Sequence, residues 1–175
     1  MKNIIFRRSK LEDLNYINEI VEDAKKFMKT LHIDQWQNGY PNEDIIKNDI
    51  DKRISYVALV DGEVAGTIVV SFNEEFGYNT IYDGHWVRDE QEHYGTIHRF
   101  AVNNKFRGMD ISKFLIQEVQ KICLEKNIDN LRADTHKGNI VMQKVLIKNA
   151  FKYCGKINIE CDGDTLRYAY QKILV

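Results

Sequence analysis

The chain has 175 residues, of which 43% are hydrophobic and 29% charged, and its formal net charge is −1. This size and composition predict one globular domain, residues 1–175, with a full hydrophobic core. The net charge is close to zero, and no apolar run approaches the roughly 18 residues of a membrane span. We therefore expect neither nucleic acid nor membrane as a partner.

The three cysteines, Cys123, Cys154 and Cys161, are odd in number and lack CxxC spacing. This pattern indicates neither a disulfide framework nor a zinc site, so reduced thiols are expected. The N-terminal residues also lack a charged and then apolar signal with a cleavage site. A cytoplasmic protein is therefore expected.

The N-terminal part of the chain combines a strand with helices. Residues 3–8 are strand-like, and Ser9 with Glu12 has the capping-box spacing that begins a helix. Apolar residues then recur at helical spacing to about Met28. A polar and aromatic segment follows, and it leads into a short second helix expected near residues 42–52.

Residues 54–72 carry the clearest hairpin pattern in the chain. Two β-rich runs, ISYVALV and EVAGTIVVSF, are joined by Asp61 and Gly62, a pair suited to the positive φ angles of a type I′ turn. Residues 73–93 then form an irregular, acidic excursion, whose acidic residues are Glu74, Glu75, Asp83, Asp89, Glu90 and Glu92. Such a segment is either a solvated face or a source of local potential that attracts a cationic amine.

The C-terminal half continues with strands and helices. Residues 95–102 have the pattern of a strand, a helix begins near Asp110, and the stretch DTHKGNIVMQ follows a strand and opens a second helix. Residues 165–174 are expected to close the chain as a strand. The order β-α-α-β-β-β-α-β-α-β-β predicts an α/β (α+β) fold around a mixed, largely antiparallel sheet.

Strand residues 97–102, IHRFAV, place a histidine beside an expected cleft. Alternate side chains of a strand point to opposite faces of its sheet. The two expected sets are Ile97, Arg99 and Ala101 on one face, and His98, Phe100 and Val102 on the other. His98 is therefore a candidate for the cleft, with a purely structural role as the alternative.

The turn KFRGMDIS opens a helix directly after this strand. It carries two cations, Lys105 and Arg107, and Gly108, which lets a ligand approach the backbone. Free N–H groups at a helix N-terminus are a ready anion site. The turn by itself fits either a cofactor phosphate site or an ordinary basic turn.

The pattern around this turn resembles motif A of the GCN5-related N-acetyltransferases (GNAT), which bind acetyl-coenzyme A. Further segments stand where that family places its landmarks, namely FRRSKLEDL, DGEVAGTI, IHRFAV, KFRGMDIS, DTHKGN and NAFKYCG. The resemblance implies a GNAT-like central sheet flanked by about four helices. It also implies acetyl-CoA as the co-substrate.

In that family the backbone amides of the turn hold the pyrophosphate of coenzyme A. Arg107 fits the family pattern, whereas Asp110 stands for a glycine and Ser112 for a smaller residue. Asp110 either caps the helix and repels a phosphate, or keeps a left-handed turn with its carboxylate outward. The cofactor-binding residues that the resemblance implies are Phe100, Ala101, Val102, Arg107, Gly108, Met109, Asp110, Ile111, Ser112, Thr135 and Asn139.

The resemblance leaves the proton-transfer groups open. Many family members have a tyrosine seven residues after the position of Asn139, where this chain has Leu146. Tyr153 or a water molecule is then the donor to the departing thiolate. On the acceptor side His98 is the candidate general base, and a water relay to a carboxylate is the alternative.

Aromatic residues mark the expected acceptor side. Trp36 and Tyr40 lie between the first two helices, a segment that lines the acceptor site in the family, and Trp86 lies in the acidic excursion. Covering the core is the structural alternative for all three. Asp134 and His136 share a strand face, but no third ligand has a helpful spacing, so we expect no metal.

Together these features predict an N-acetyltransferase. It would move an acetyl group from acetyl-CoA to the primary amine of a small molecule or peptide, by direct attack in a ternary complex. The alternative, motivated by Asp110 and Leu146, is a CoA-binding or interaction module of the same fold with little catalytic activity. A homodimer is also expected, because family members often pair.

Overall fold

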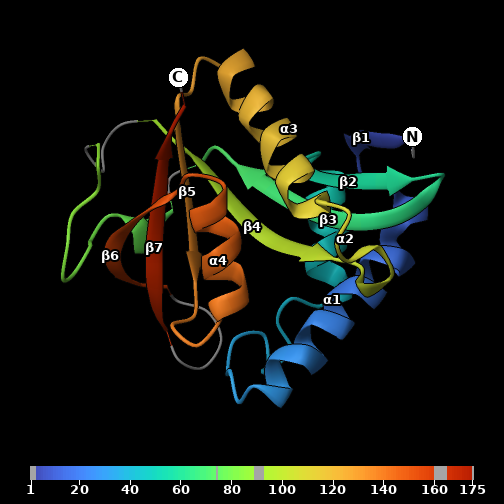
Figure 1. The fold of residues 1–175 in the computed structure, drawn as a ribbon, viewed down its shortest axis with the longest axis horizontal. Helices are drawn as coiled ribbons and strands as arrows, with labels where there is room; N and C mark the ends of the chain where they lie inside the picture. Colours follow the sequence, from blue (N-terminus) through green and yellow to red (C-terminus); the bar gives the residue numbers. More distant parts are fainter. Residues whose placement is uncertain (1–2, 74, 89–92, 160–164, 175) are drawn as a thin grey trace.

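Seven strands form one sheet in the order β1-β2-β3-β4-β5-β7-β6 (Figure 1). The computed structural model describes residues 3–73, 75–88, 93–159 and 165–174. The strands are β1 (Ile4–Arg8), β2 (Ser55–Val60), β3 (Glu63–Ser71), β4 (Gly95–Val102), β5 (Asn130–Thr135), β6 (Lys152–Asn158) and β7 (Leu166–Ile173). The β4–β5 pair is parallel and the other five neighbouring pairs are antiparallel. The predicted mixed, largely antiparallel α/β fold is confirmed.

Helices cover both faces of this sheet. The helices are α1 (Leu14–Thr30), α2 (Glu43–Asp51), α3 (Ile111–Glu125) and α4 (Ile140–Lys148). Short 3₁₀ turns are η1 (Leu11–Asp13), η2 (Phe76–Tyr78) and η3 (Asn104–Phe106). Figure 1 shows α3 and α4 in front of the sheet, with α1 along its lower edge. The predicted order of helices and strands is therefore confirmed.

The alternation of buried residues in β2 shows how one sheet serves two cores. Ala58 and Val60 pack with α3 and α4 in what we call the α3-side core. Val57 and Leu59 pack with α1 and α2 in the α1-side core. All six residues of β2 are buried, because both faces of this strand are covered by helices.

None of the described helices is both long and apolar enough to cross a bilayer.

The start of α1 differs in detail from the expected capping box. Ser9 does not cap the helix, because its Oγ lies 2.8 Å from Ser55 Oγ in β2. Instead Asp13 Oδ2 accepts the backbone N–H of Lys10 at 2.7 Å, and the Asp13 carboxylate also accepts two bonds from Arg7. The helix was predicted correctly, but the pairing of Ser9 with Glu12 was wrong.

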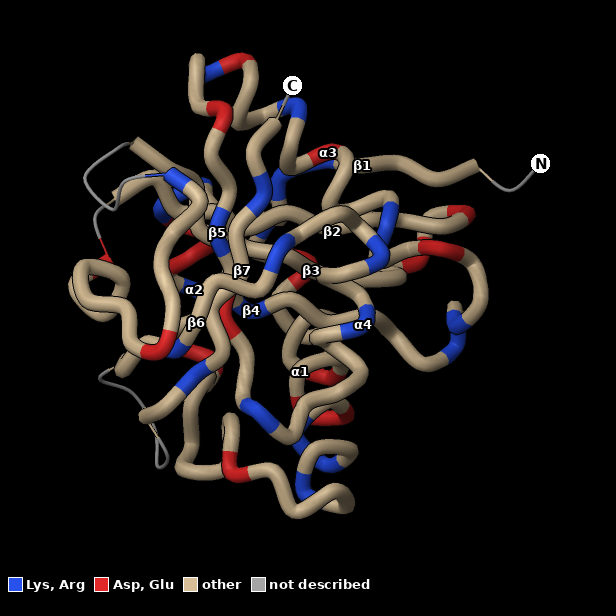
Figure 2. Tube along the Cα trace, turned by 60° about the vertical axis from the view of Figure 1, so that its left-hand side comes forward, with Lys and Arg blue, Asp and Glu red and all other residues tan. Residues whose placement is uncertain are grey.

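The structure describes the whole hairpin but only part of the excursion that follows it. Asp61 and Gly62 have φ angles of 50° and 89°, as the type I′ turn requires, so the predicted hairpin is confirmed. In the excursion, Asp83 pairs with Lys156 of β6 at 2.7 Å. The predicted acidic residues Glu74, Asp89, Glu90 and Glu92 lie outside the described residues. Figure 2 shows acidic and basic residues interspersed over the elements in view.

Candidate active site

The two central parallel strands separate from each other part-way along their length. The β4–β5 ladder runs from Gly95 with Leu131 to Ile97 with Ala133, and no further pair follows in the described chain. A cavity of about 890 Å³ lies where the strands part. Its walls come from the α1–α2 segment, η2, the ends of β4 and β5, and the starts of α3 and α4.

A bulge in β4 changes which side chains share a face. Arg99 has a φ of 45°, and the β3–β4 register shifts at this point. Ile97 and Phe100 consequently both pack in the α3-side core, whereas Ala101 packs in the α1-side core. The predicted alternation along residues 97–102 was wrong beyond His98, because one extra residue in a strand reverses the faces that follow it. His98 and Arg99 both line the cavity.

The turn before α3 keeps the shape of a phosphate-binding turn. Asp110 has left-handed backbone angles, φ 55° and ψ 25°, and its exposed side chain caps no helix amide. Gly108 has a φ of 79°. Among the described residues, no acceptor bonds the amides of Gly108, Asp110, Ile111 and Ser112. These amides are therefore a candidate anion site at the start of a helix. Of the two alternatives for Asp110, the structure shows a left-handed residue whose carboxylate does not cap the helix.

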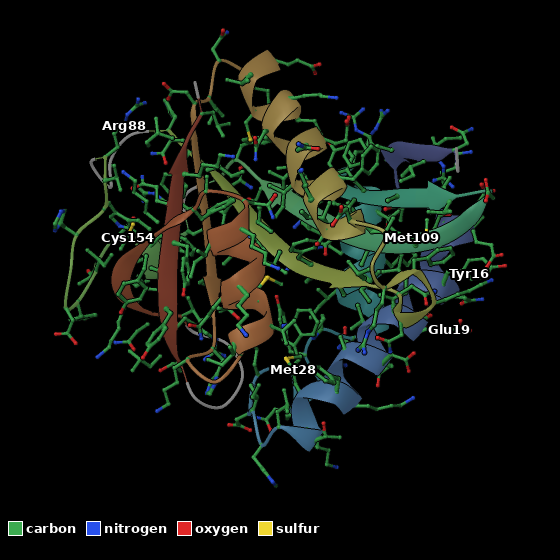
Figure 3. All side chains as sticks on the ribbon, in the orientation of Figure 1. Tyr16, Glu19, Met28, Arg88, Met109 and Cys154 are labelled. Carbon is green, nitrogen blue, oxygen red and sulfur yellow. The ribbon has the colours of Figure 1, made fainter. Side chains whose placement is uncertain are left out.

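The predicted cofactor residues cluster at this end of the cavity. All of them line it except Met109, which packs against the α3-side core. Arg107 is exposed, with its guanidinium carbon 5.7 Å from the centre of the Phe27 ring. Figure 3 labels Met109 in the turn that joins β4 to α3, and Met28 near the end of α1.

Asn139 caps α4 and also faces the cavity. Its Oδ1 accepts the amide of Met142 at 3.1 Å, and its Nδ2 lies 3.5 Å from Gln35 Oε1. The same Gln35 oxygen lies 3.4 Å from the Thr135 hydroxyl and accepts the amide of His136 at 3.2 Å. Gln35 thus joins the α1–α2 segment to the β5–α4 loop. It was missed in the sequence, where no spacing marks it.

His98 is paired with a carboxylate of the acidic excursion. Its Nε2 lies 2.9 Å from Glu75 Oε1. Burial by itself raises the pKa of Glu75, but the hydrogen bond and charge of His98 outweigh it and the pKa is lowered. The sequence placed Glu75 only in a general acidic excess, so its contact with His98 is a product of the fold.

A second pair stands on the neighbouring strand. The buried Tyr78 hydroxyl donates to Asp134 Oδ1 at 2.6 Å. Burial raises the pKa of Asp134, and burial together with the Asp134 charge raises that of Tyr78 well above its ordinary value. His136 does not join Asp134, because its Nδ1 accepts the amide of Gly138 at 2.9 Å.

Arg99 ties α2 and the segment between α1 and α2 to the sheet. Its Nη2 donates to Asp49 Oδ1 at 2.9 Å, and its Nη1 donates to the Tyr40 hydroxyl at 2.7 Å. Burial alone lowers the pKa of Arg99, but Tyr40 and Asp49 outweigh it and the pKa is raised. Trp36 and Tyr40 both line the cavity, where they were expected.

Two predicted residues lie outside the cavity. Tyr153 is 48% exposed on the edge strand β6, and its ring packs edge-on against those of Tyr168 and Tyr170. Trp86 is buried, stacked on the Tyr78 ring at 5.6 Å with the Arg132 guanidinium on it. We therefore correct both assignments, since β7 separates Tyr153 from β5 and since the Trp86 ring fills a core.

A family model described as the acetyltransferase (GNAT) family matches residues 18–151. The chain belongs to this family. Acetyl transfer from acetyl-CoA is general to GNAT proteins. No curated protein matches the sequence.

Solved structures support the same family. A GNAT acetyltransferase from Streptococcus agalactiae 2603 is 32% identical, with a TM-score of 0.89 over 98% of this chain and 96% of that one. PaiA N-acetyltransferase from Thermoplasma acidophilum, solved in complex with coenzyme A, is 20% identical, with a TM-score of 0.70 over 98% and 99%. Ribosomal-protein-alanine N-acetyltransferase from Brucella melitensis is 18% identical, with a TM-score of 0.68 over 97% and 99%. The last two show the shared fold alone.

Proposed function

We propose that this GNAT protein transfers an acetyl group from acetyl-CoA to the primary amine of a small molecule or peptide, by direct attack in a ternary complex. The observation that carries the proposal is one continuous cavity with two different ends. Open backbone amides and Arg107 lie at one end, and the His98–Glu75 pair lies at the other. An anion-binding end joined to a proton-accepting end suits a reaction between a phosphate-bearing donor and an amine.

The residues at the first end fit coenzyme A. The amides of Gly108, Asp110, Ile111 and Ser112, which bond no acceptor among the described residues, would hold its pyrophosphate, with Arg107 supplying positive charge. The β4 backbone of residues 100–102 and the amide of Asn139 would contact the pantetheine arm. When bound, the coenzyme supplies an acetyl thioester. The protein contributes by holding the reacting groups together, which lowers the entropic part of the barrier.

At the other end, His98 would take a proton from the acceptor. An amine with a lysine-like pKa of about 10.4 is mostly protonated at pH 7, and deprotonating it costs roughly 4–5 kcal/mol. The Glu75 carboxylate lies 2.9 Å from Nε2 and orients the ring, so that Nδ1 is the nitrogen left to take the proton. A matching acid for the departing sulfur is not needed, because a thiol with a reference pKa of about 8.5 is a reasonable leaving group. Leu146, fully buried, offers no proton there.

Calorimetry and a thiol-release assay test this proposal. We expect CoA and acetyl-CoA to bind, and free thiol to appear when acetyl-CoA is mixed with a panel of primary amines and peptides. His98→Ala should remove the acidic limb of the pH–rate profile, and an unchanged limb would remove His98 from the role of base. Binding without thiol release would favour a CoA-binding module, and no binding would favour an interaction protein.

We also propose a cytoplasmic homodimer as the working state of the protein. The cytoplasmic location is supported by the odd number of cysteines and their lack of CxxC spacing, which indicate reduced thiols. For the acceptor, the family acetylates amines of small molecules or proteins. Light scattering at several protein concentrations would test the dimer, since a constant monomer mass would exclude it.

A further inference from the structure

The point where β4 and β5 separate carries one functional side chain from each strand. Ile97 and Ala133 form the last pair of the parallel ladder. The next residues of the two strands are His98 and Asp134, and both line the cavity. The proposed function uses His98 and leaves Asp134 without a role.

One short turn of the excursion contacts both strands at this point. Glu75 reaches His98, and Tyr78 reaches Asp134 with a hydrogen bond of 2.6 Å. The amide of Tyr78 donates to the carbonyl of Glu75 at 2.8 Å, which closes the turn. Trp86 stacks on the Tyr78 ring, and its Nε1 donates to the Tyr78 carbonyl at 3.1 Å. The Asp134 carboxylate is therefore held in one orientation by a rigid aromatic support.

The second oxygen of Asp134 remains available to a ligand. In the part of the chain that the structure describes, Oδ2 accepts no hydrogen bond. The charged or titratable groups that face Asp134 are Tyr78 and Glu75 from the η2 turn, His98 from β4 and Arg167 from β7. Burial raises the pKa of Asp134, while the Tyr78 bond and the charges of His98 and Arg167 oppose the rise.

An ammonium ion suits this oxygen better than a neutral amine does. It offers both an N–H donor and a counter-charge, and charge-assisted bonds are about twice as strong as neutral ones. A neutral amine brings no charge to this half-buried carboxylate and gains only an ordinary hydrogen bond from it. Glu75 is less suited to this task, because its carboxylate already bonds two side chains, His98 and Ser71.

Resting on the proposed acetyltransferase function, we propose that Asp134 binds the ammonium form of the acceptor, with Tyr78 as its positioning residue. The substrate class is then a positively charged primary amine. His98 Nε2 donates its own proton to the Glu75 carboxylate, so the bound ammonium gives one proton to His98 Nδ1. An N–H bond of the substrate breaks, an N–H bond of the imidazole forms, and the electron pair stays on the amine nitrogen, which becomes the nucleophile.

Asp134→Asn removes the negative charge but keeps the size of the side chain, and its amide oxygen can still accept the hydrogen bond from Tyr78. The probes are isobutylamine, which is protonated near neutral pH, and trifluoroethylamine, which has a similar size and is uncharged there. Thiol release from acetyl-CoA gives kcat and KM for each amine. Calorimetry of the CoA-loaded protein gives the dissociation constant of each amine without turnover.

We expect Asp134→Asn to raise KM and the dissociation constant for isobutylamine about tenfold or more, as for loss of a charge-assisted contact. The values for trifluoroethylamine should change less than about twofold. Tyr78→Phe should raise KM for isobutylamine with a smaller effect on kcat, as a positioning role requires. Asp44→Asn removes the same charge from an exposed site on α2 and is the matched control, with both amines unaffected.

Equal losses for both amines, or no loss for isobutylamine, would overturn the inference. A wild-type protein that binds the two amines equally well would do the same. If the wild-type protein does not bind CoA, the proposed function itself fails. CoA binding with turnover that is indifferent to Asp134→Asn overturns only the role of Asp134.

Discussion

Arg99 holds together the side of the cavity that we propose for the acceptor. It stands at the bulge of β4 and bonds both Asp49 of α2 and Tyr40 of the α1–α2 segment. Asp49 is only 3% exposed. The Arg99–Asp49 pair therefore compensates the charge of a carboxylate that burial alone would disfavour. The same arginine also positions Tyr40 in the cavity wall, so the shape of this wall depends on a contact that stabilises the fold.

Removing Arg99 should be costly for this reason. We expect Arg99→Met to lower the free energy of unfolding by about 3–5 kcal/mol, because it leaves Asp49 buried without its partner. Adding Asp49→Leu should recover part of the loss, since the uncompensated charge is then gone. Urea denaturation measures both variants. Lys47→Met breaks an exposed pair with Asp51 and is the control, with no measurable loss expected.

Whereas replacing Arg99 should destabilise the fold, replacing Asp134 by a neutral residue should stabilise it. Because burial raises its pKa, the ionised form is disfavoured in the folded state, and this cost is present at neutral pH. Asp134→Asn should therefore raise the melting temperature at pH 7. The gain should shrink as the pH falls through the raised pKa of the folded state and vanish below the ordinary value of 3.8. A gain that persists unchanged in acid would contradict this assignment of cause.

Among the elements, the turn into α3 has the most direct bearing on the cofactor. Asp110 already holds the left-handed angles that a glycine adopts without strain. Its carboxylate stands beside the amides that would hold a pyrophosphate. The turn therefore keeps its left-handed shape with aspartate in place of glycine, but the aspartate adds a negative charge near the proposed anion site.

Replacing Asp110 should tighten coenzyme A binding. We expect Asp110→Gly to lower the dissociation constant about two- to fivefold, because a charge near a helix N-terminus contributes roughly 0.3–1 kcal/mol. Asp110→Asn removes the charge but keeps a side chain that tolerates the turn, and it should give the charge part alone. Calorimetry with CoA measures both. Weaker binding by Asp110→Gly would show that the carboxylate assists the site.

At the scale of the whole molecule, the sheet has its shortest ladder of paired residues where the cavity lies. The parallel β4–β5 ladder has three pairs, whereas the antiparallel β5–β7 ladder has six. Residues from α1, β4 and α4 line the same cavity on both sides of this short ladder. A ligand in the cavity therefore connects the two halves of the sheet.

Coenzyme A should consequently stabilise the protein as a unit. At a concentration 100 times its dissociation constant, we expect the free energy of unfolding to rise by about 2.7 kcal/mol. Hydrogen exchange should slow in segments 100–112 and 135–142, which contribute residues to the cavity wall, and stay unchanged in β1 at the far edge of the sheet. Slower exchange spread evenly over all strands would speak against this placement of the ligand.

Much of the fold could be predicted from the sequence, because its signals are local. The hydrophobic period of α1 and α3, the Asp61–Gly62 turn and the basic turn before α3 each depend on residues close in the chain. The strand at residues 95–102 was predicted with the observed bounds. The anion-binding end of the cavity belongs to this class, because it consists of one turn and the first residues of one helix.

The acceptor end was decided by the tertiary structure alone. His98 meets Glu75 across 23 residues, Arg99 meets Asp49 across 50, and Asp134 meets Tyr78 across 56. The bulge at Arg99 changes the faces of β4, and the excursion folds back over the ends of two strands. Tyr153 and Trp86 were misplaced for the same reason. A local pattern determines which element forms, but only packing between distant elements determines which side chains meet in a cleft.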